Sequence, residues 1–182
     1  MSLILAELEQ DGMNEQGKSL SKLAAIVDEF ADLDKHERLE LLLDFAEHLP
    51  ELPTKYQADL DAGEHRVHEC QTPVFLWVEV NAGRVQIHAH AARESPTVKG
   101  FVAILVAAFS GASPEEILAV KPDLLQRLGL AEALGMSRMR GLPAILGRIR
   151  QEVRLAAATS SCQADCGRNQ TDEPMGVSPD YS

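Results

Sequence analysis

Apolar positions between residues 18 and 50 recur every three or four residues, the spacing of amphipathic helices. A first helix is predicted from Ser19. A second helix begins after Asp34, which forms a capping-box pair with Glu37 three residues later, and it ends at Pro50. The buried face of the second helix is predicted to consist of Leu39, Leu42, Leu43, Ala46 and Leu49. The chain therefore begins its folded part with a pair of helices.

A period of two residues replaces the helical period between residues 74 and 91. Residues 74–80 are rich in β-branched and aromatic side chains, and over 85–91 apolar and polar residues alternate. The turn sequence Asn81-Ala82-Gly83 separates these two segments. The pattern predicts a β-hairpin, preceded by a short strand around 66–68.

Helical periodicity returns after Ser95 and continues to about residue 156. Ser95, followed by a proline, begins a helix that is apolar on almost all sides, so we expect that helix to be deeply buried. Further helices are predicted after Ser113, over 122–134 and after Ser137. The apolar stripe of the last helix is formed by Leu142, Ile145, Leu146, Ile149 and Val153. This order predicts an α+β fold, in which a small antiparallel sheet of about three strands packs against several helices.

The folded unit is predicted to carry a loose segment at each end. Residues 1–17 are polar and acidic after a short apolar start, and residues 157–182 contain almost no apolar side chains. The second segment cannot bury enough surface to offset the entropy of ordering it, so we predict a disordered, acidic C-terminal tail. Residues 18–156 then form one domain, of a length that a single core supports.

The charge balance favours a protein partner over nucleic acid or a membrane. The 182 residues include 17 Lys and Arg and 28 Asp and Glu, a formal net charge of −11 with neutral His. Nucleic acids and anionic membrane surfaces attract clustered positive charge, so neither is expected to bind. The longest apolar run, residues 101–109, is shorter than the roughly 18 residues of a membrane span, and no signal or transit pattern is present. We expect a cytoplasmic protein.

The chain has three cysteines, which is a small and odd number for a disulfide scaffold. This count favours a reducing compartment. Cys70 is the candidate for chemistry because it precedes Pro73 in a predicted turn, where a thiol can reach a partner molecule. The alternative is a small buried residue near a strand end. Cys162 and Cys166 lie in the predicted tail, where metal capture, a disulfide and no role all remain open.

Histidines near these positions are predicted to be exposed side chains. His65 and His68 lie close to Cys70 in the sequence, and His88 and His90 alternate on the polar face of the second predicted strand. A zinc site needs three or four ligands, and no second cluster follows at zinc-like spacing, so no metal site is expected. Phosphate-binding glycine loops and nucleophile elbows are also absent from the sequence.

Three stretches, taken in order, carry a resemblance to a known family. They are His68-Glu69-Cys70-Gln71-Thr72 followed by Val74-Phe75-Leu76, then Val98-Lys99-Gly100, then Ser137-Arg138-Met139-Arg140-Gly141-Leu142. Each stretch is weak alone. Together, with the matching predicted elements, they resemble the SufE family of sulfur-acceptor proteins over about residues 19–156.

The resemblance implies a sulfur carrier and activator more than an enzyme. Family members accept sulfur from a PLP-dependent cysteine desulfurase, stimulate it, and pass the sulfur to an acceptor or scaffold of iron–sulfur cluster assembly. The acceptor cysteine of the family falls on Cys70, and PLP belongs to the partner, so this chain needs no cofactor of its own. Arg138, Lys99 and Gln71 are the expected supporting or partner-binding residues. Glu69 stands where the family usually has glycine, and its carboxylate disfavours a neighbouring thiolate.

Two other functions are compatible with the residues. An iron–sulfur or metal scaffold of the related fold needs about three cysteine or carboxylate ligands, and Cys70 is the one cysteine of the predicted domain. A self-contained thiol enzyme, in which His65 or His68 activates Cys70, needs a pocket and a group that orients the base. The sequence alone leaves both alternatives open.

Overall fold

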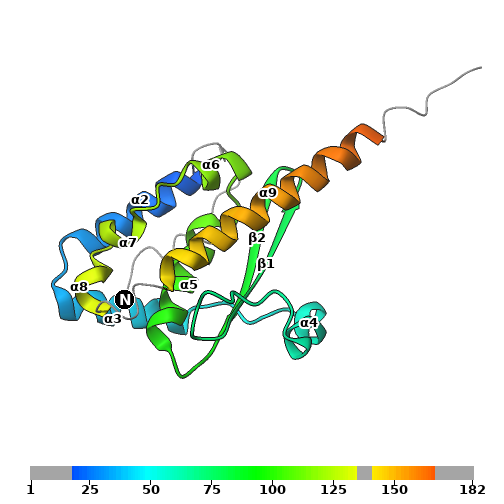
Figure 1. The fold of residues 1–182 in the computed structure, drawn as a ribbon. Helices are drawn as coiled ribbons and strands as arrows, with labels where there is room; N and C mark the ends of the chain where they lie inside the picture. Colours follow the sequence, from blue (N-terminus) through cyan, green and yellow to red (C-terminus); the bar gives the residue numbers. More distant parts are fainter. Residues whose placement is uncertain (1–17, 135–140, 167–182) are drawn as a thin grey trace, which may run out of the picture.

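The structure is a computed structural model that describes residues 18–134 and 141–166. Figure 1 shows a hairpin with most helices gathered on one side and α9 running across it. The elements are α2 (Lys18–Ala31), α3 (Lys35–Glu47), η1 (Thr54–Tyr56), α4 (Gln57–Ala62), β1 (Val74–Asn81), β2 (Arg84–Ala91), α5 (Pro96–Phe109), α6 (Pro114–Ala119), α7 (Leu124–Arg127), α8 (Leu130–Leu134) and α9 (Leu142–Cys166). The predicted α+β class is confirmed.

The hairpin forms where the alternating pattern predicts it. Strands β1 and β2 pair antiparallel, from Val74 opposite Ala91 to Asn81 opposite Arg84. The two loop residues have positive φ angles, 50° at Ala82 and 75° at Gly83, which are the angles of a type I′ turn. One face of the hairpin packs on α5 and α9, so the hairpin and these two helices share the hydrophobic core.

The predicted third strand is wrong. Within the part of the chain that the structure describes, the sheet has two strands, and residues 66–68 contribute only an isolated bridge between Arg66 and Phe75. The amide of Val67 donates to the Val74 carbonyl at 2.8 Å, but the amide of Cys70 already turns back to the carbonyl of Val67 at 3.2 Å. Because the chain reverses immediately after the bridge, the pairing cannot extend into a strand.

Helix α5 lies at the centre of the core, as its apolar sequence predicts. It contacts α2, α3, α9 and β2, and every side chain from residue 101 to 106 is buried. Helices α5 and α3 approach each other closely at Gly100, where an added Cβ would overlap the carbonyl oxygen of Leu42 in α3. The glycine therefore permits α3 and α5 to pack at this distance.

Helix α3 begins as predicted but buries a slightly different face. The capping box is present: the Asp34 carboxylate accepts from the Glu37 amide at 3.0 Å, and the Asp34 amide donates to the Glu37 carboxylate at 2.7 Å. Leu43, which was predicted to be buried, is 39% exposed, and Phe45 is buried instead. The Phe45 ring stacks at 6.3 Å on that of Phe30 in α2, and this contact sets the rotation of α3.

Helix α9 buries the predicted stripe from Leu142 to Val153. It continues beyond Ala156, where the sequence places the end of the domain, and reaches Cys166, so its last turns extend away from the body (Figure 1). The tail was predicted to be disordered from residue 157, and this is wrong for residues 157–166, which are helical. Residues 1–17 and 167–182 lie outside the described residues. Among the described helices, none combines the length and apolar character that crossing a membrane requires.

Candidate functional site

Cys70 lies in the loop of residues 67–73, between Arg66, which forms the isolated bridge, and the start of strand β1 at Val74. This segment is called the Cys70 loop. The Cys70 amide donates to the carbonyl of Val67, and two residues later the Thr72 hydroxyl donates to the Ser95 hydroxyl at 3.1 Å. Ser95 is the N-cap residue of α5, as predicted, but its side chain makes no cap hydrogen bond. Its hydroxyl accepts from the loop instead, so the loop is tied to the first turn of α5.

The thiol of Cys70 is buried, whereas its neighbours in the loop face solvent. Cys70 is 4% exposed, and His68, Glu69 and Gln71 are all exposed. The thiol packs against the residue that precedes α9: a Cβ added to Gly141 would lie 3.4 Å from the Cys70 Sγ. In this structure the candidate thiol is therefore held inside, beneath an exposed loop.

The surroundings of Cys70 favour the neutral thiol. Burial raises its pKa above the ordinary value, while a hydrogen bond from the Thr72 amide and the charge of Arg66 lower it without cancelling the effect of burial. Burial is the main cause, whereas the sequence pointed to the carboxylate of Glu69. At neutral pH the resting side chain is protonated, so it becomes a good nucleophile only after it leaves this position.

Replacing Gly141 with valine is expected to expose Cys70. The valine Cγ atoms would extend beyond the Cβ position and enter the space that the sulfur occupies. Alkylation of Cys70 by iodoacetamide at pH 7, followed by peptide mass spectrometry, should become several-fold faster than in the unchanged protein. The matched control is Gly141→Ala, whose Cβ fits at ordinary contact distance and should leave the rate unchanged. An unchanged rate in folded Gly141→Val would show that this contact does not hold the thiol inside.

The other predicted site residues differ in how close the structure brings them to Cys70. Gln71 is adjacent and exposed. Lys99 is in the first turn of α5, where its amide donates to the Ser95 carbonyl at 3.0 Å, and it is not among the charged groups that shift the pKa of Cys70. Arg138 lies outside the described residues. Their supporting and partner-binding roles stay predictions.

Sequence reasoning missed Arg66, the cation whose charge acts on Cys70. Arg66 precedes the thiol by four residues, and the turn between Val67 and Cys70 lies between them. The signal in the sequence was an arginine next to a short β-prone segment, which on its own indicates only a solvent-exposed side chain. The effect of its charge on the pKa of Cys70 is found only in the folded structure.

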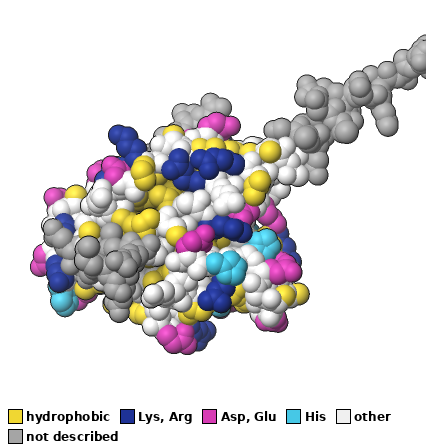
Figure 2. All heavy atoms as spheres, viewed as in Figure 1, with side chains coloured by type: hydrophobic (Ala, Val, Ile, Leu, Met, Phe, Trp, Pro, Cys, Tyr) yellow, Lys and Arg dark blue, Asp and Glu magenta, His cyan; other side chains and the backbone are white. Residues whose placement is uncertain are grey.

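The histidines around the hairpin contribute to an aromatic cluster on its outer face. The rings of His65 and Trp77 lie 5.4 Å apart, and those of His88 and Tyr56 lie 5.1 Å apart. His88 is half-buried, and burial lowers its pKa. Figure 2 shows histidine side chains reaching the surface over the hairpin, beside side chains of both charges. Among the residues that the structure describes, no group of three or more His, Cys, Asp or Glu is arranged to hold a metal.

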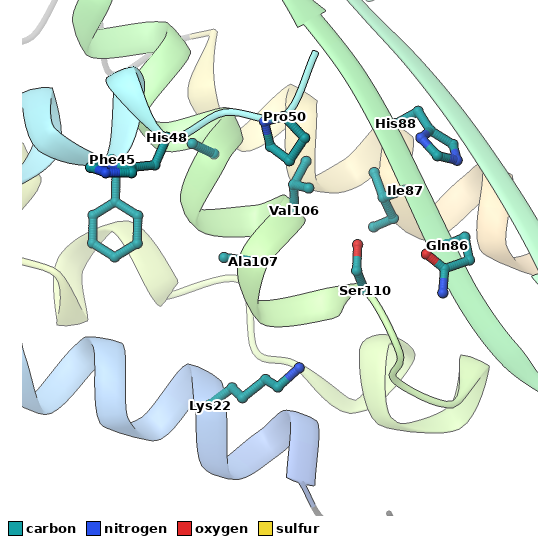
Figure 3. A pocket seen from close by; sticks show the side chains of 11 residues that line it. Lys22, Phe45, His48, Pro50, Gln86, Ile87, His88, Val106, Ala107 and Ser110 are labelled. Atoms are coloured by element: carbon teal, nitrogen blue, oxygen red, sulfur yellow. The ribbon is translucent and has the colours of Figure 1, made fainter. Parts of the chain in front are cut away.

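A pocket of about 410 Å³ lies between α2, α3, α5 and β2. Figure 3 shows Phe45, Ile87 and Val106 among its apolar walls, with Lys22 and His48 among the polar side chains around them. None of its lining residues belongs to the Cys70 loop. The pocket is therefore separate from the thiol and cannot supply the base-orienting group that a self-contained thiol enzyme would need there.

Comparison with known proteins assigns the chain to a protein family. Residues 24–153 match the family model of SufE, described as an Fe-S metabolism associated domain. This chain belongs to the SufE family. The matched range contains the hairpin, the Cys70 loop and helix α5. The family supports a role in iron–sulfur metabolism and sulfur transfer, in agreement with the resemblance in the sequence.

Individual relatives agree with this assignment to the SufE family. An uncharacterized SufE-like protein of Mycobacterium tuberculosis is 39% identical over 135 residues, which cover 74% of this chain and 92% of the relative. A cysteine desulfuration protein SufE of Plasmodium falciparum is 32% identical over 90 residues, 48% of this chain and 36% of that protein. The solution structure of a hypothetical protein from Thermus thermophilus superposes with a TM-score of 0.66 at 38% identity, covering 75% of this chain and 96% of the other.

Proposed function

We propose that this SufE-family protein accepts sulfur on Cys70 from a cysteine desulfurase, stimulates that enzyme, and passes the sulfur on to iron–sulfur cluster assembly. The observation that carries the proposal is the placement of Cys70. It is the one buried side chain between residues 68 and 73, in a loop whose other side chains are exposed or half-buried. A partner that binds this loop therefore contacts the exposed residues on both sides of a single thiol.

The proposed transfer moves one sulfur atom between two thiols without net oxidation. The Cys70 thiolate attacks the outer sulfur of a cysteine persulfide on the desulfurase. A new S–S bond forms at Cys70, and the S–S bond of the donor breaks. The electron pair leaves with the desulfurase cysteine, which takes up the proton that Cys70 released. The desulfurase is then free for another turnover, which is why an acceptor also stimulates it.

Contacts of the Cys70 loop are consistent with movement on binding. Among the described residues, the hydrogen bonds that hold this loop are few: Val67 to Val74 at its base, Cys70 to Val67, Thr72 to Ser95, and the Ala92 amide to the Pro73 carbonyl at 3.2 Å. Segments with few buried contacts open at low cost. Binding of a desulfurase to the exposed loop residues can therefore draw the thiol out, which removes the burial that raises its pKa.

Replacing Cys70 with serine is expected to abolish the stimulation of the desulfurase. Purified protein is mixed with a cysteine desulfurase and free cysteine, and alanine formation is followed over time. The unchanged protein should raise the rate, and Cys70→Ser should leave it at the level of the desulfurase alone, because serine cannot attack the persulfide sulfur. A protein with both Cys162→Ser and Cys166→Ser is the control and should stimulate fully. Full stimulation by Cys70→Ser would refute the proposal.

A further inference from the structure

The pocket between α2, α3, α5 and β2 meets strand β2 at its edge. Gln86, Ile87 and His88 all line the pocket. Successive side chains of a strand point to opposite faces of the sheet, so what these three residues have in common is the strand edge. Figure 3 shows β2 bordering the pocket, and β1 pairs with the other edge of β2. The pocket therefore lies where a further extended segment can pair with β2.

Within the described part of the chain, Ile87 has main-chain groups without partners at this edge. Val85 uses its outward groups: its amide donates to the Ala112 carbonyl and its carbonyl accepts from the Gly111 amide, both at 2.8 Å. Because the outward direction recurs at every second residue of a strand, the amide and carbonyl of Ile87 point to the same edge. No main-chain group of the described residues bonds to them, although Ile87 is only 3% exposed. Buried main-chain groups are nearly always paired, so Ile87 requires a partner.

A peptide segment with bulky apolar side chains matches this pocket. Each peptide residue carries one donor and one acceptor, as the amide and carbonyl of Ile87 require, whereas a small apolar anion offers acceptors alone. The walls beside the edge are apolar and include Phe45, Val106 and Ala107. A volume of about 410 Å³ is within the range of pockets that bury a ligand. The edge and the walls together favour an extended, apolar segment.

Residues 3–8 of this chain have that composition and can reach the pocket. They read Leu-Ile-Leu-Ala-Glu-Leu. The segment precedes α2, which begins at Lys18 and contributes Lys22 to the pocket wall. Figure 3 shows the Lys22 side chain extending from α2 toward α5. Lys18 and Lys22 are about 6 Å apart along the helix axis, and the chain from Leu8 to Lys18 can span up to about 33 Å when it is extended.

The charges of the segment and the pocket are complementary. Residues 1–17 contain four acidic residues and no Lys or Arg: Glu7, Glu9, Asp11 and Glu15. Among the described residues, the pocket lining contains Lys22, His48 and His88 but no Asp or Glu. Acidic side chains beside the apolar stretch would therefore meet no carboxylate in the lining. A segment of this chain satisfies the requirements of shape, hydrogen bonding and charge together.

We propose that residues 3–8 bind in this pocket. Their main chain lies extended along β2 and pairs with the amide and carbonyl of Ile87, and their apolar side chains pack on Phe45 and Val106. The pocket shares no lining residue with the Cys70 loop, so the proposal goes beyond the proposed function and does not rest on it. A desulfurase assay tests the proposed function, and the two measurements below test the binding of this segment.

Methyl NMR of the full chain tests the contact directly. With the methyl groups of Ile, Leu and Val labelled, the proposal predicts nuclear Overhauser contacts from residues 3–8 to Ile87 or Val106. Dilution with an excess of unlabelled protein leaves these contacts unchanged if they lie within one chain and weakens them if they join two copies. Contacts that persist on dilution support the proposal. Contacts that are lost on dilution, or no contacts from residues 3–8, would overturn it.

Replacing Leu3, Ile4 and Leu5 together with aspartate is expected to accelerate hydrogen exchange of the Ile87 amide about tenfold, as the loss of one hydrogen bond predicts. Carboxylates cannot be buried against apolar walls without a large cost, so the segment leaves the pocket. The matched control replaces Gln10, Met13 and Asn14 with aspartate, which adds the same charge outside residues 3–8, and should match the unchanged protein. Equal exchange of the Ile87 amide in the two variants would contradict the binding of residues 3–8 beside it.

Discussion

Replacing Gly100 with alanine is expected to lower the free energy of unfolding by about 3 kcal/mol, the upper part of the range for overpacked sites. The added methyl group would overlap the Leu42 carbonyl oxygen and lie 3.0 Å from the Leu42 Cδ1. Backbone atoms of a packed helix cannot move aside as a flexible side chain does, so α3 and α5 must separate. Alanine favours a helix over glycine by about 1 kcal/mol, too little to offset the clash.

Thermal and chemical denaturation measure this change. For a chain of this size, a loss of 3 kcal/mol corresponds to a decrease in Tm of about 6–12 °C. The matched control is Gly147→Ala in α9, where an added Cβ meets nothing within 4 Å. That variant should be neutral or more stable by up to about 1 kcal/mol. If Gly100→Ala were as stable as Gly147→Ala, the close packing of α3 on α5 would not be what requires the glycine.

Local patterns were enough to predict most of the fold. The turn at Gly83, the burial of α5 and the stripe of α9 follow from residues near one another in the sequence, and all three are confirmed. The third strand was wrong because its length depends on the turn that Cys70 makes with Val67. The face of α3 was partly wrong because the contact of Phe45 with another helix decides it.

The site was predictable in its central residue but not in its surroundings. Cys70 stood out from its place in a turn and from the family resemblance, but its burial depends on Gly141, far along the chain. Arg66 was missed because the effect of its charge on the pKa of Cys70 depends on how the backbone folds between the two residues. Gly100 was recognised as part of a family motif, and the structure gives that position a packing role.

Sulfur acceptance by Cys70 is the second large effect that the structure leads us to expect. Incubation with a cysteine desulfurase and free cysteine should convert the Cys70 thiol to a persulfide, while the same protein without desulfurase should remain unmodified. Free cysteine has no S–S bond from which a sulfur could be transferred, so without the desulfurase Cys70 has no sulfur to accept. The expected contrast is therefore between nearly complete modification and none.

Peptide mass spectrometry after this incubation tests the central claim most directly. Blocking free and sulfurated thiols with iodoacetamide and digesting with trypsin places Cys70 in peptide 67–84, apart from Cys162 and Cys166 in peptide 155–168. The account predicts an added sulfur, about 32 Da, on peptide 67–84 of the unchanged protein and none on that peptide in Cys70→Ser. Peptide 67–84 without added sulfur, in a reaction where the desulfurase turns over, would contradict it.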